Sequence, residues 1–129
     1  MLCLENDTVD AMVYDDQRSP RESISRTLKK VYGLGKVLQE DNIFSLRMDL
    51  AIHRPKVLVL DYMYEGGLNL NYVAAVLKSF KGIGVIHSSV DVERIEKELG
   101  GIPKNFTYVQ KGNARRLHDA LDKILSPRS

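Results

Sequence analysis

The sequence predicts an α/β domain in which five parallel strands alternate with five helices. Short, continuously apolar runs recur along the chain, and segments with the helical spacing of apolar residues separate them. Continuous rather than alternating apolar character is typical of strands that helices cover on both faces. With 129 residues, 43% of them hydrophobic, the chain has the size of one domain with a substantial core.

Five apolar runs are the predicted strands. They cover residues 11–14, 37–38, 57–60, 83–86 and 106–109. A helical segment lies between each pair and the connections are short, which requires right-handed crossovers and therefore a parallel sheet. This is the flavodoxin-like doubly wound class, in which ligands bind at the carboxyl ends of the strands near the switch in strand order.

The first helix is predicted over residues 20–32. Ser19 is placed to cap it, Pro20 suits its first turn, and Glu22 completes the pattern of a capping box. The residues expected to face the core are Ile24, Leu28 and Val31.

The other helices have start and stop signals as well. The second begins at about Ile43 and ends near His53, because a proline at position 55 disfavours helical geometry at the residue before it. The third follows Asn69, the fourth begins near Asp91, and the fifth is capped by Asn113. The residues expected to face the core are Ile43, Leu46, Leu50 and Ala51, then Leu70, Val73, Ala74 and Leu77, then Val92, Ile95 and Leu99, and finally Leu117, Ala120, Leu121 and Ile124.

Composition argues against several classes of protein. The net charge of +2 is close to balance, so nucleic-acid binding by this domain alone is not favoured. The apolar runs are far shorter than the roughly 20 residues of a membrane span, and the N-terminus lacks a signal layout, so we expect a cytoplasmic protein with no membrane partner. A single cysteine, Cys3, cannot form an internal disulfide. Residues 1–7 are expected to be an N-terminal extension, 8–125 the domain and 126–129 a tail.

Polar residues follow four of the predicted strands at the edge where ligands are expected. They are Asp15 and Asp16, Asp61, Ser88 and Ser89, and Lys111. Three carboxylates raise one another's pKa unless a cation lies among them, and Mg²⁺ is the ordinary choice for such oxygen ligands. A carboxylate can accept a phosphoryl group covalently, and a lysine and a hydroxyl then stabilise the phosphoryl oxygens.

The chain resembles the receiver domain of two-component response regulators from about residue 8 to residue 125. The stretches that carry the resemblance are MVYDD at 12–16, VLVLD at 57–61, VIHSS at 85–89 and YVQK at 108–111. The resemblance implies that Asp61 is the phosphoacceptor. It also implies that Asp15, Asp16, Asp61 and the backbone carbonyl of Met63 bind Mg²⁺.

The same resemblance implies a switch. The hydroxyl of Ser88 would move to the phosphoryl group, Lys111 would pair with it, and Tyr108 would swing inward. Ser89 stays open as the alternative to Ser88, which is favoured because it directly follows the apolar strand. The chain would not be an enzyme beyond Mg²⁺-dependent self-phosphorylation from a phosphodonor and autodephosphorylation.

The sequence departs from the receiver pattern in its loops. Gly112 follows Lys111 where the family has a cis proline, so we expect a trans peptide there. Met63 and Val90 occupy the two positions that hold the hydrolytic water in receivers, and neither side chain can hydrogen-bond to water. Slow autodephosphorylation is the expected consequence.

The resemblance implies that the phosphoryl group comes from a histidine kinase or phosphotransfer protein. The fourth helix, fifth strand and fifth helix would then present a surface to a downstream protein or to a second copy. The altered loops leave a pseudo-receiver, a phosphorylation-independent docking module, as the alternative. A metal-dependent phosphatase would want a second acid where Met63 stands.

Overall fold

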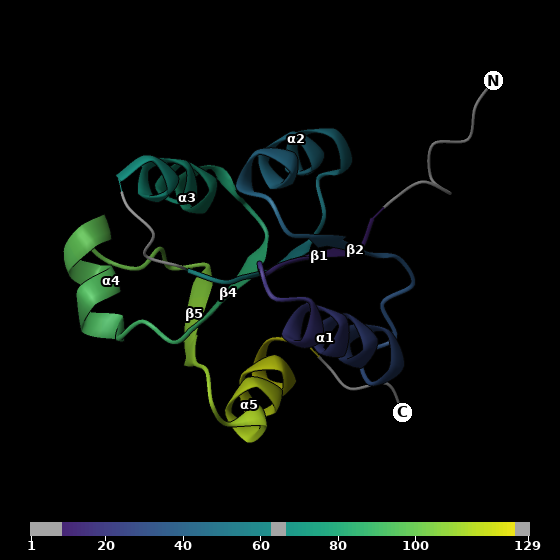
Figure 1. Ribbon diagram of the computed structural model, residues 1–129. Helices are drawn as coiled ribbons and strands as arrows, with labels where there is room; N and C mark the ends of the chain where they lie inside the picture. The colour runs from purple at the N-terminus through teal and green to yellow at the C-terminus, as the bar shows by residue number, and fades with distance from the viewer. Residues whose placement is uncertain (1–8, 63–66, 126–129) are drawn as a thin grey trace.

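The structure, a computed structural model, describes residues 9–62 and 67–125 and shows a parallel sheet between two layers of helices (Figure 1). In sheet order the strands are β2 (Val37–Glu40), β1 (Ala11–Tyr14), β3 (Val57–Leu60), β4 (Ile83–Ser88) and β5 (Phe106–Gln110). The helices are α1 (Arg18–Lys30), α2 (Ile43–His53), α3 (Gly67–Ser79), α4 (Val92–Leu99) and α5 (Ala114–Ile124). This strand order confirms the predicted flavodoxin-like fold. The expected extension 1–7 and tail 126–129 lie outside the described residues.

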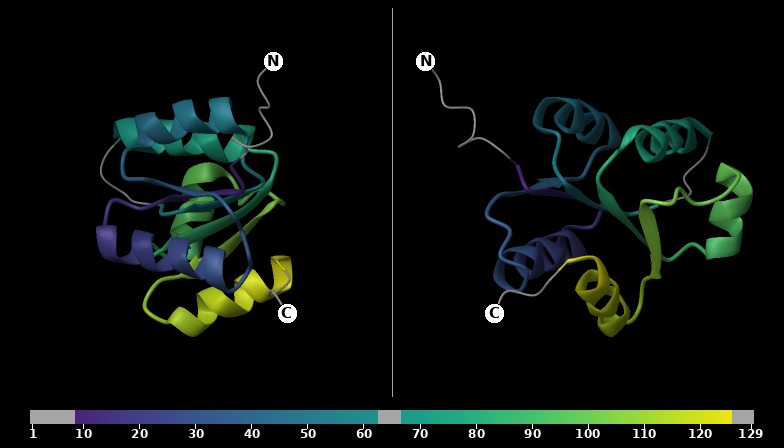
Figure 2. Two further views of the ribbon diagram at one scale, coloured as in Figure 1. Left: turned by 90° about the vertical axis from the view of Figure 1, so that its right-hand side faces the viewer. Right: turned by 180° about the vertical axis from the view of Figure 1, so that it is seen from behind.

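Two apolar clusters form the core, one on each face of the sheet. Figure 2 shows α1 and α5 covering one face and α2 and α3 covering the other. Ile24 and Leu28 of α1 pack with Leu121 of α5 in the first cluster, while α2, α3 and α4 supply the second. All residues of β1 and β3 are buried, as their continuous apolar character predicted.

The register of the sheet brings the strand ends to one edge. Tyr14 of β1 pairs with Leu60 of β3 and with Glu40 of β2. The ladder continues one step further, because the amide of Asp61 donates to the carbonyl of Tyr14 at 2.9 Å. Asp15 and Asp61 therefore leave neighbouring strands at the same height.

The start of α1 differs from the prediction. The helix begins at Arg18 with Gln17 at the N-cap, so the assignment of Ser19 as the cap was wrong. The Asp15 carboxylate accepts a hydrogen bond from the Gln17 amide at 2.9 Å and so forms the turn that starts the helix earlier. Glu22 pairs with Arg18 at 3.4 Å instead of closing a capping box.

Two residues expected in the core lie outside it. Val31 follows the end of α1 and is 38% exposed, whereas Tyr32 is buried and donates its hydroxyl hydrogen bond to the Asp122 carboxylate at 2.5 Å. Ala51 is exposed because its side chain lies at a surface groove and does not pack against the sheet. The side chain of Leu70 lies outside the described residues.

Helix α3 begins at Gly67, so the prediction that it follows Asn69 was wrong by two residues. The signals at the start of α5 and the end of α2 behave as predicted. The Asn113 side chain caps α5 by accepting from the Arg115 amide at 2.9 Å. Helix α2 ends at His53, where Arg54 takes a left-handed conformation with φ of 46° before the proline. Within the described part of the chain, no helix is both long and apolar enough to cross a membrane.

Candidate functional site

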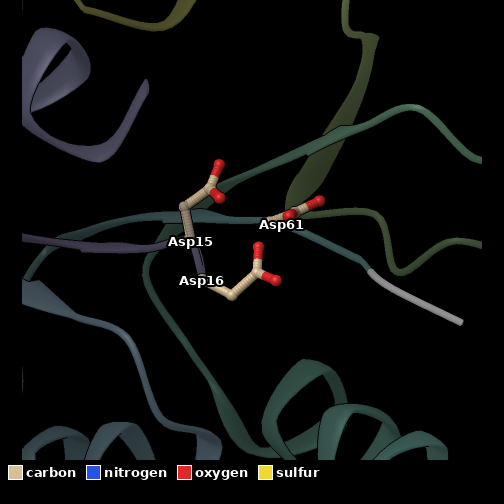
Figure 3. Close-up of side chains that lie close together, drawn as sticks. All are labelled: Asp15, Asp16 and Asp61. Atoms are coloured by element: carbon tan, nitrogen blue, oxygen red, sulfur yellow. The ribbon is translucent and has the colours of Figure 1, made fainter. Parts of the chain in front are cut away.

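Three carboxylates gather at the carboxyl edge of the sheet. Asp15 and Asp16 leave the end of β1 and Asp61 leaves the end of β3, and one ligand oxygen from each lies within 4.8 Å of the others. Figure 3 shows the three side chains extending from the two strand ends into one region. Asp15 and Asp61 are only 1% and 4% exposed, whereas Asp16 is exposed to solvent. The predicted acidic cluster is therefore present in space.

Lys111, at the end of β5, joins two of these carboxylates. Its Nζ lies 2.9 Å from Oδ2 of Asp15 and 3.1 Å from Oδ2 of Asp61. Burial by itself lowers the pKa of Lys111, but the hydrogen bonds and charges of the two aspartates outweigh burial and raise it. Lys111 is therefore a permanent cation that holds the ends of β1, β3 and β5 together.

The orientation of Asp15 is set from both sides. Its Oδ1 accepts from the Gln17 amide, which leaves Oδ2 for Lys111. The guanidinium of Arg21, on α1, donates to the Asp15 backbone carbonyl at 2.9 Å. The sequence prediction missed both supporting residues, since neither belongs to a strand end.

The pKa of Asp61 reflects first its burial and then the charges around it. Burial raises this pKa, the charge and hydrogen bond of Lys111 oppose the rise, and the charges of Asp15 and Asp16 add to it, with a net value of about 6. One lysine does not neutralise three carboxylates. Hard oxygen ligands with surplus negative charge are the donor set that suits Mg²⁺, so the residues present fit this ion. Met63, whose carbonyl was predicted to complete the set, lies outside the described residues.

Ser88 and Ser89 have different environments. Ser88 is fully buried; its hydroxyl donates to the backbone carbonyl of Tyr62 at 2.5 Å and accepts from the amide of Val90 at 3.0 Å. Ser89 is exposed. The Ser88 hydroxyl thus joins the residue that follows Asp61 to the loop that leads into α4.

Tyr108 reaches the same loop from β5. Its ring is half-buried and its hydroxyl donates to the carbonyl of Val90 at 2.5 Å. Burial raises the pKa of Tyr108, and the charge of Asp91 adds to this rise. Ser88 and Tyr108 therefore hold the amide and the carbonyl of one residue, Val90, so a movement of either hydroxyl frees one side of the loop.

Tyr62 and Glu98 form a contact that the sequence analysis did not find. Tyr62 is 1% exposed and its hydroxyl donates to Oε1 of Glu98, on α4, at 2.6 Å. Glu98 also pairs with Arg94 one turn earlier in the helix, at 3.6 Å. The one available signal was that a buried tyrosine hydroxyl needs a partner. Nothing in the sequence pointed to Glu98 as that partner.

The remaining predicted features lie around the cluster. His87, on β4, has a buried Nδ1 without a hydrogen-bond partner among the described residues. Burial and, to a smaller extent, the Lys111 charge lower the pKa of His87 to about 4 against an opposing effect of Asp15, so the ring is neutral at neutral pH. Gly112 follows Lys111 through a trans peptide, as expected, and its φ of 109° is a conformation that favours glycine.

Comparison with known proteins defines the fold. No family model and no curated protein matches the sequence. Among solved structures, the signal receiver domain of the putative response regulator NarL from Mycobacterium tuberculosis is similar, with a TM-score of 0.66 and 22% identity over 90% of this chain and 95% of that chain. The chemotaxis protein CheY4 from Vibrio cholerae is similar with a TM-score of 0.67 and 17% identity, over 92% of this chain and 99% of that chain.

A third similar structure is a two component transcriptional regulator AraC from Clostridium phytofermentans, with a TM-score of 0.67 and 20% identity over 92% of both chains. The chain thus has the receiver-domain fold along nearly its whole length. In this fold the acidic cluster of Asp15, Asp16 and Asp61 fits a magnesium site.

Proposed function

We propose that this chain is a phosphorylation-controlled switch whose phosphoacceptor is Asp61. The observation that carries the proposal is the convergence of three carboxylates and Lys111 at the carboxyl edge of a receiver fold. The phosphoryl group comes from a histidine kinase or a phosphotransfer protein, and the output is a surface formed by α4, β5 and α5. A downstream protein or a second copy recognises that surface.

The transfer needs an ionised acceptor and a cationic surrounding. An oxygen of Asp61 attacks phosphorus, the bond between phosphorus and the donor's imidazole breaks, and its electron pair returns to the imidazole nitrogen. With a pKa of about 6, Asp61 is mainly ionised at neutral pH. Lys111, already within 3.1 Å of this carboxylate, pairs with the phosphoryl oxygens.

Asp15, Asp16 and Asp61, together with the carbonyl of Met63, are the residues that would hold Mg²⁺. When bound, the ion supplies positive charge opposite the phosphoryl oxygens. The protein contributes by keeping the Asp15 carboxylate oriented. The Gln17 amide does this by donating a hydrogen bond to Oδ1 of Asp15.

Ser88 converts the new charge into movement. A hydroxyl hydrogen bond to an anionic phosphoryl oxygen is roughly twice as strong as one to a neutral carbonyl. Ser88 therefore leaves the carbonyl of Tyr62 and the amide of Val90, and the loop held by Tyr108 is released on one side. Because Tyr62 also bonds to Glu98, the change reaches α4 directly.

Intact-mass measurement after incubation with Mg²⁺ and acetyl phosphate tests the proposal. The wild type should gain one phosphoryl group, Asp61→Asn should gain none, and Asp119→Asn, an exposed aspartate on α5, should behave as the wild type. A phosphoryl gain in Asp61→Asn would move the site elsewhere. An unmodified wild type would favour the alternative, a phosphorylation-independent docking module.

A further inference from the structure

A groove of about 720 Å³ lies between α2 and α3, far from the acidic cluster. Pro55, just before β3, and Gly82, just before β4, line it, so it opens at the amino edge of the sheet, opposite the carboxyl edge that carries Asp61. Among the residues that line it, Leu50, Val76 and Phe80 are apolar. Arg47, Arg54 and Lys81 are cationic. No acidic residue is among the described residues that line it.

The outer face of α2 extends this apolar surface. Phe44, Met48 and Ile52 are 51%, 65% and 66% exposed, and their spacing of four residues places them in one stripe along the helix. The Phe44 ring packs edge-on against Tyr72 of α3 with centroids 4.7 Å apart. Phe44 therefore lies on the α3 side of α2. Each stripe residue also lies three positions before a residue that lines the groove, Arg47, Ala51 or Pro55, so the stripe borders the groove. A helix that is apolar on its core face and on a second face is typical of one that is covered on both.

Charge is segregated around α2. The Arg47 guanidinium lies 5.0 Å from the Tyr72 ring centroid, on the groove side. Asp49, the one acidic residue of the helix, faces Glu40 of β2 instead. Arg54 has a left-handed backbone conformation, which glycine adopts more readily than arginine. Its side chain nevertheless places a cation at the groove.

We propose that the groove and the Phe44–Met48–Ile52 stripe together bind an acidic amphipathic helix of a partner protein. From Phe44 to Ile52 the stripe covers eight residue steps, about 12 Å along a helix axis, which suits a ligand with anchors at i, i+4 and i+7. Acidic residues beside those anchors meet the three cations.

Other occupants fit the surface less well. A small anion in the groove would leave the stripe exposed, and a flat bilayer does not fill a concave groove. A second copy offers no acidic helix with an exposed apolar stripe among the described elements. Ile95 of α4 and Leu117 and Leu121 of α5 are turned into the core. The exposed stripe of α2 adjoins Arg47 and Arg54, whose charges would repel the same cations in the other copy. The proposed interface is separate from the phosphorylation site and from the α4–β5–α5 surface.

The test uses a designed, fluorescein-labelled peptide with leucine at i, i+4 and i+7 and glutamate elsewhere. A peptide of the same composition in scrambled order and one with lysine for glutamate are the controls. Fluorescence anisotropy measures binding to the full chain, and amide chemical-shift changes in ¹⁵N spectra locate it. We expect the acidic amphipathic peptide alone to bind, with shifts confined to α2, α3 and residues 81–82.

Two variants separate binding from folding. Arg54→Gly removes one cation while it relieves the positive φ, so the fold is retained and affinity should fall about fivefold. Met48→Gln, at a side chain 65% exposed, should lower affinity about tenfold. Lys29→Gln, in the last turn of α1, and Val31→Gln, directly after that helix, are the matched controls at exposed side chains and should bind as the wild type.

Several results would overturn the proposal. These are failure of the acidic peptide to bind, equal binding of the scrambled peptide, and binding that Arg54→Gly and Met48→Gln leave unchanged. Two further results assign the surface to another occupant and equally overturn it: binding to anionic phosphatidylserine vesicles that both variants abolish, or a concentration-dependent dimer in sedimentation that both variants dissociate.

Discussion

Removing the hydroxyl of Tyr62, which follows β3 by two residues, is expected to loosen α4 from the end of that strand. The Tyr62 hydroxyl is buried and donates at 2.6 Å to Glu98, whose side chain is 17% exposed. A hydrogen bond to a charged group contributes about 1.5–3 kcal/mol. Glu98 keeps its pairing with Arg94 when the hydroxyl is lost. We therefore expect Tyr62→Phe to lower the free energy of unfolding by about 1–2 kcal/mol and the Tm by roughly 3–8 °C.

A double-mutant cycle isolates this contact. Urea unfolding of the wild type, Tyr62→Phe, Glu98→Gln and the double variant gives the interaction energy, and we expect a coupling of about 1 kcal/mol. Tyr72→Phe, a half-buried tyrosine of α3, is the matched control and should change stability little.

The same variant tests the path from Asp61 to α4. With Mg²⁺ and beryllofluoride, Tyr62→Phe should still bind the phosphoryl mimic, because its backbone carbonyl and the acidic cluster are unchanged. Its amide shifts in α4 should be smaller than those of the wild type. Strictly additive stability changes, or wild-type shifts in α4, would refute the reasoning.

Three further predictions concern the site and its surroundings. Lys111→Ala should still gain the phosphoryl mass, because the proposed acceptor Asp61 is retained. Its amide chemical shifts should no longer respond to phosphorylation, because the cation proposed to pair with the phosphoryl oxygens is lost. Loss of Mg²⁺ binding itself, measured by calorimetry, would contradict the role proposed for Lys111. The phosphorylated mass should decay slowly in Mg²⁺ buffer and faster in a Met63→Asn, Val90→Glu variant, since neither native side chain positions water; a half-life of seconds that the variant leaves unchanged would rule this out. Burial, and then Asp49, raise the pKa of Glu40 well above its ordinary value of 4.5. Because the folded state holds this proton more tightly, its contribution to stability is complete below about 4.5 and is lost as pH rises toward the raised pKa. Glu40→Gln should therefore be less sensitive to pH in urea unfolding than the wild type over this window, and parallel pH profiles would contradict the assignment.

The order of elements and the place of the acidic cluster followed from the sequence alone. Continuously apolar runs with helices between them leave few arrangements other than a parallel sheet, and strand ends in such a sheet share one edge. Asp15, Asp61 and Lys111 could therefore be placed together before any distance was known. One local signal held as well: the Asn113 side chain caps α5, whereas the capping box expected from Ser19 and Glu22 did not form.

Contacts between distant parts of the chain were decided by tertiary structure. The start of α1 moved because the Asp15 carboxylate, fixed by Lys111 from β5, accepts the Gln17 amide. Tyr62 and Glu98 are 36 residues apart, and they meet because Ile95 brings α4 into the same apolar cluster as Tyr62. Periodicity says that a helix has an apolar face, but which residues that face covers depends on side-chain packing between elements, and pairwise packing leaves no trace in a single sequence.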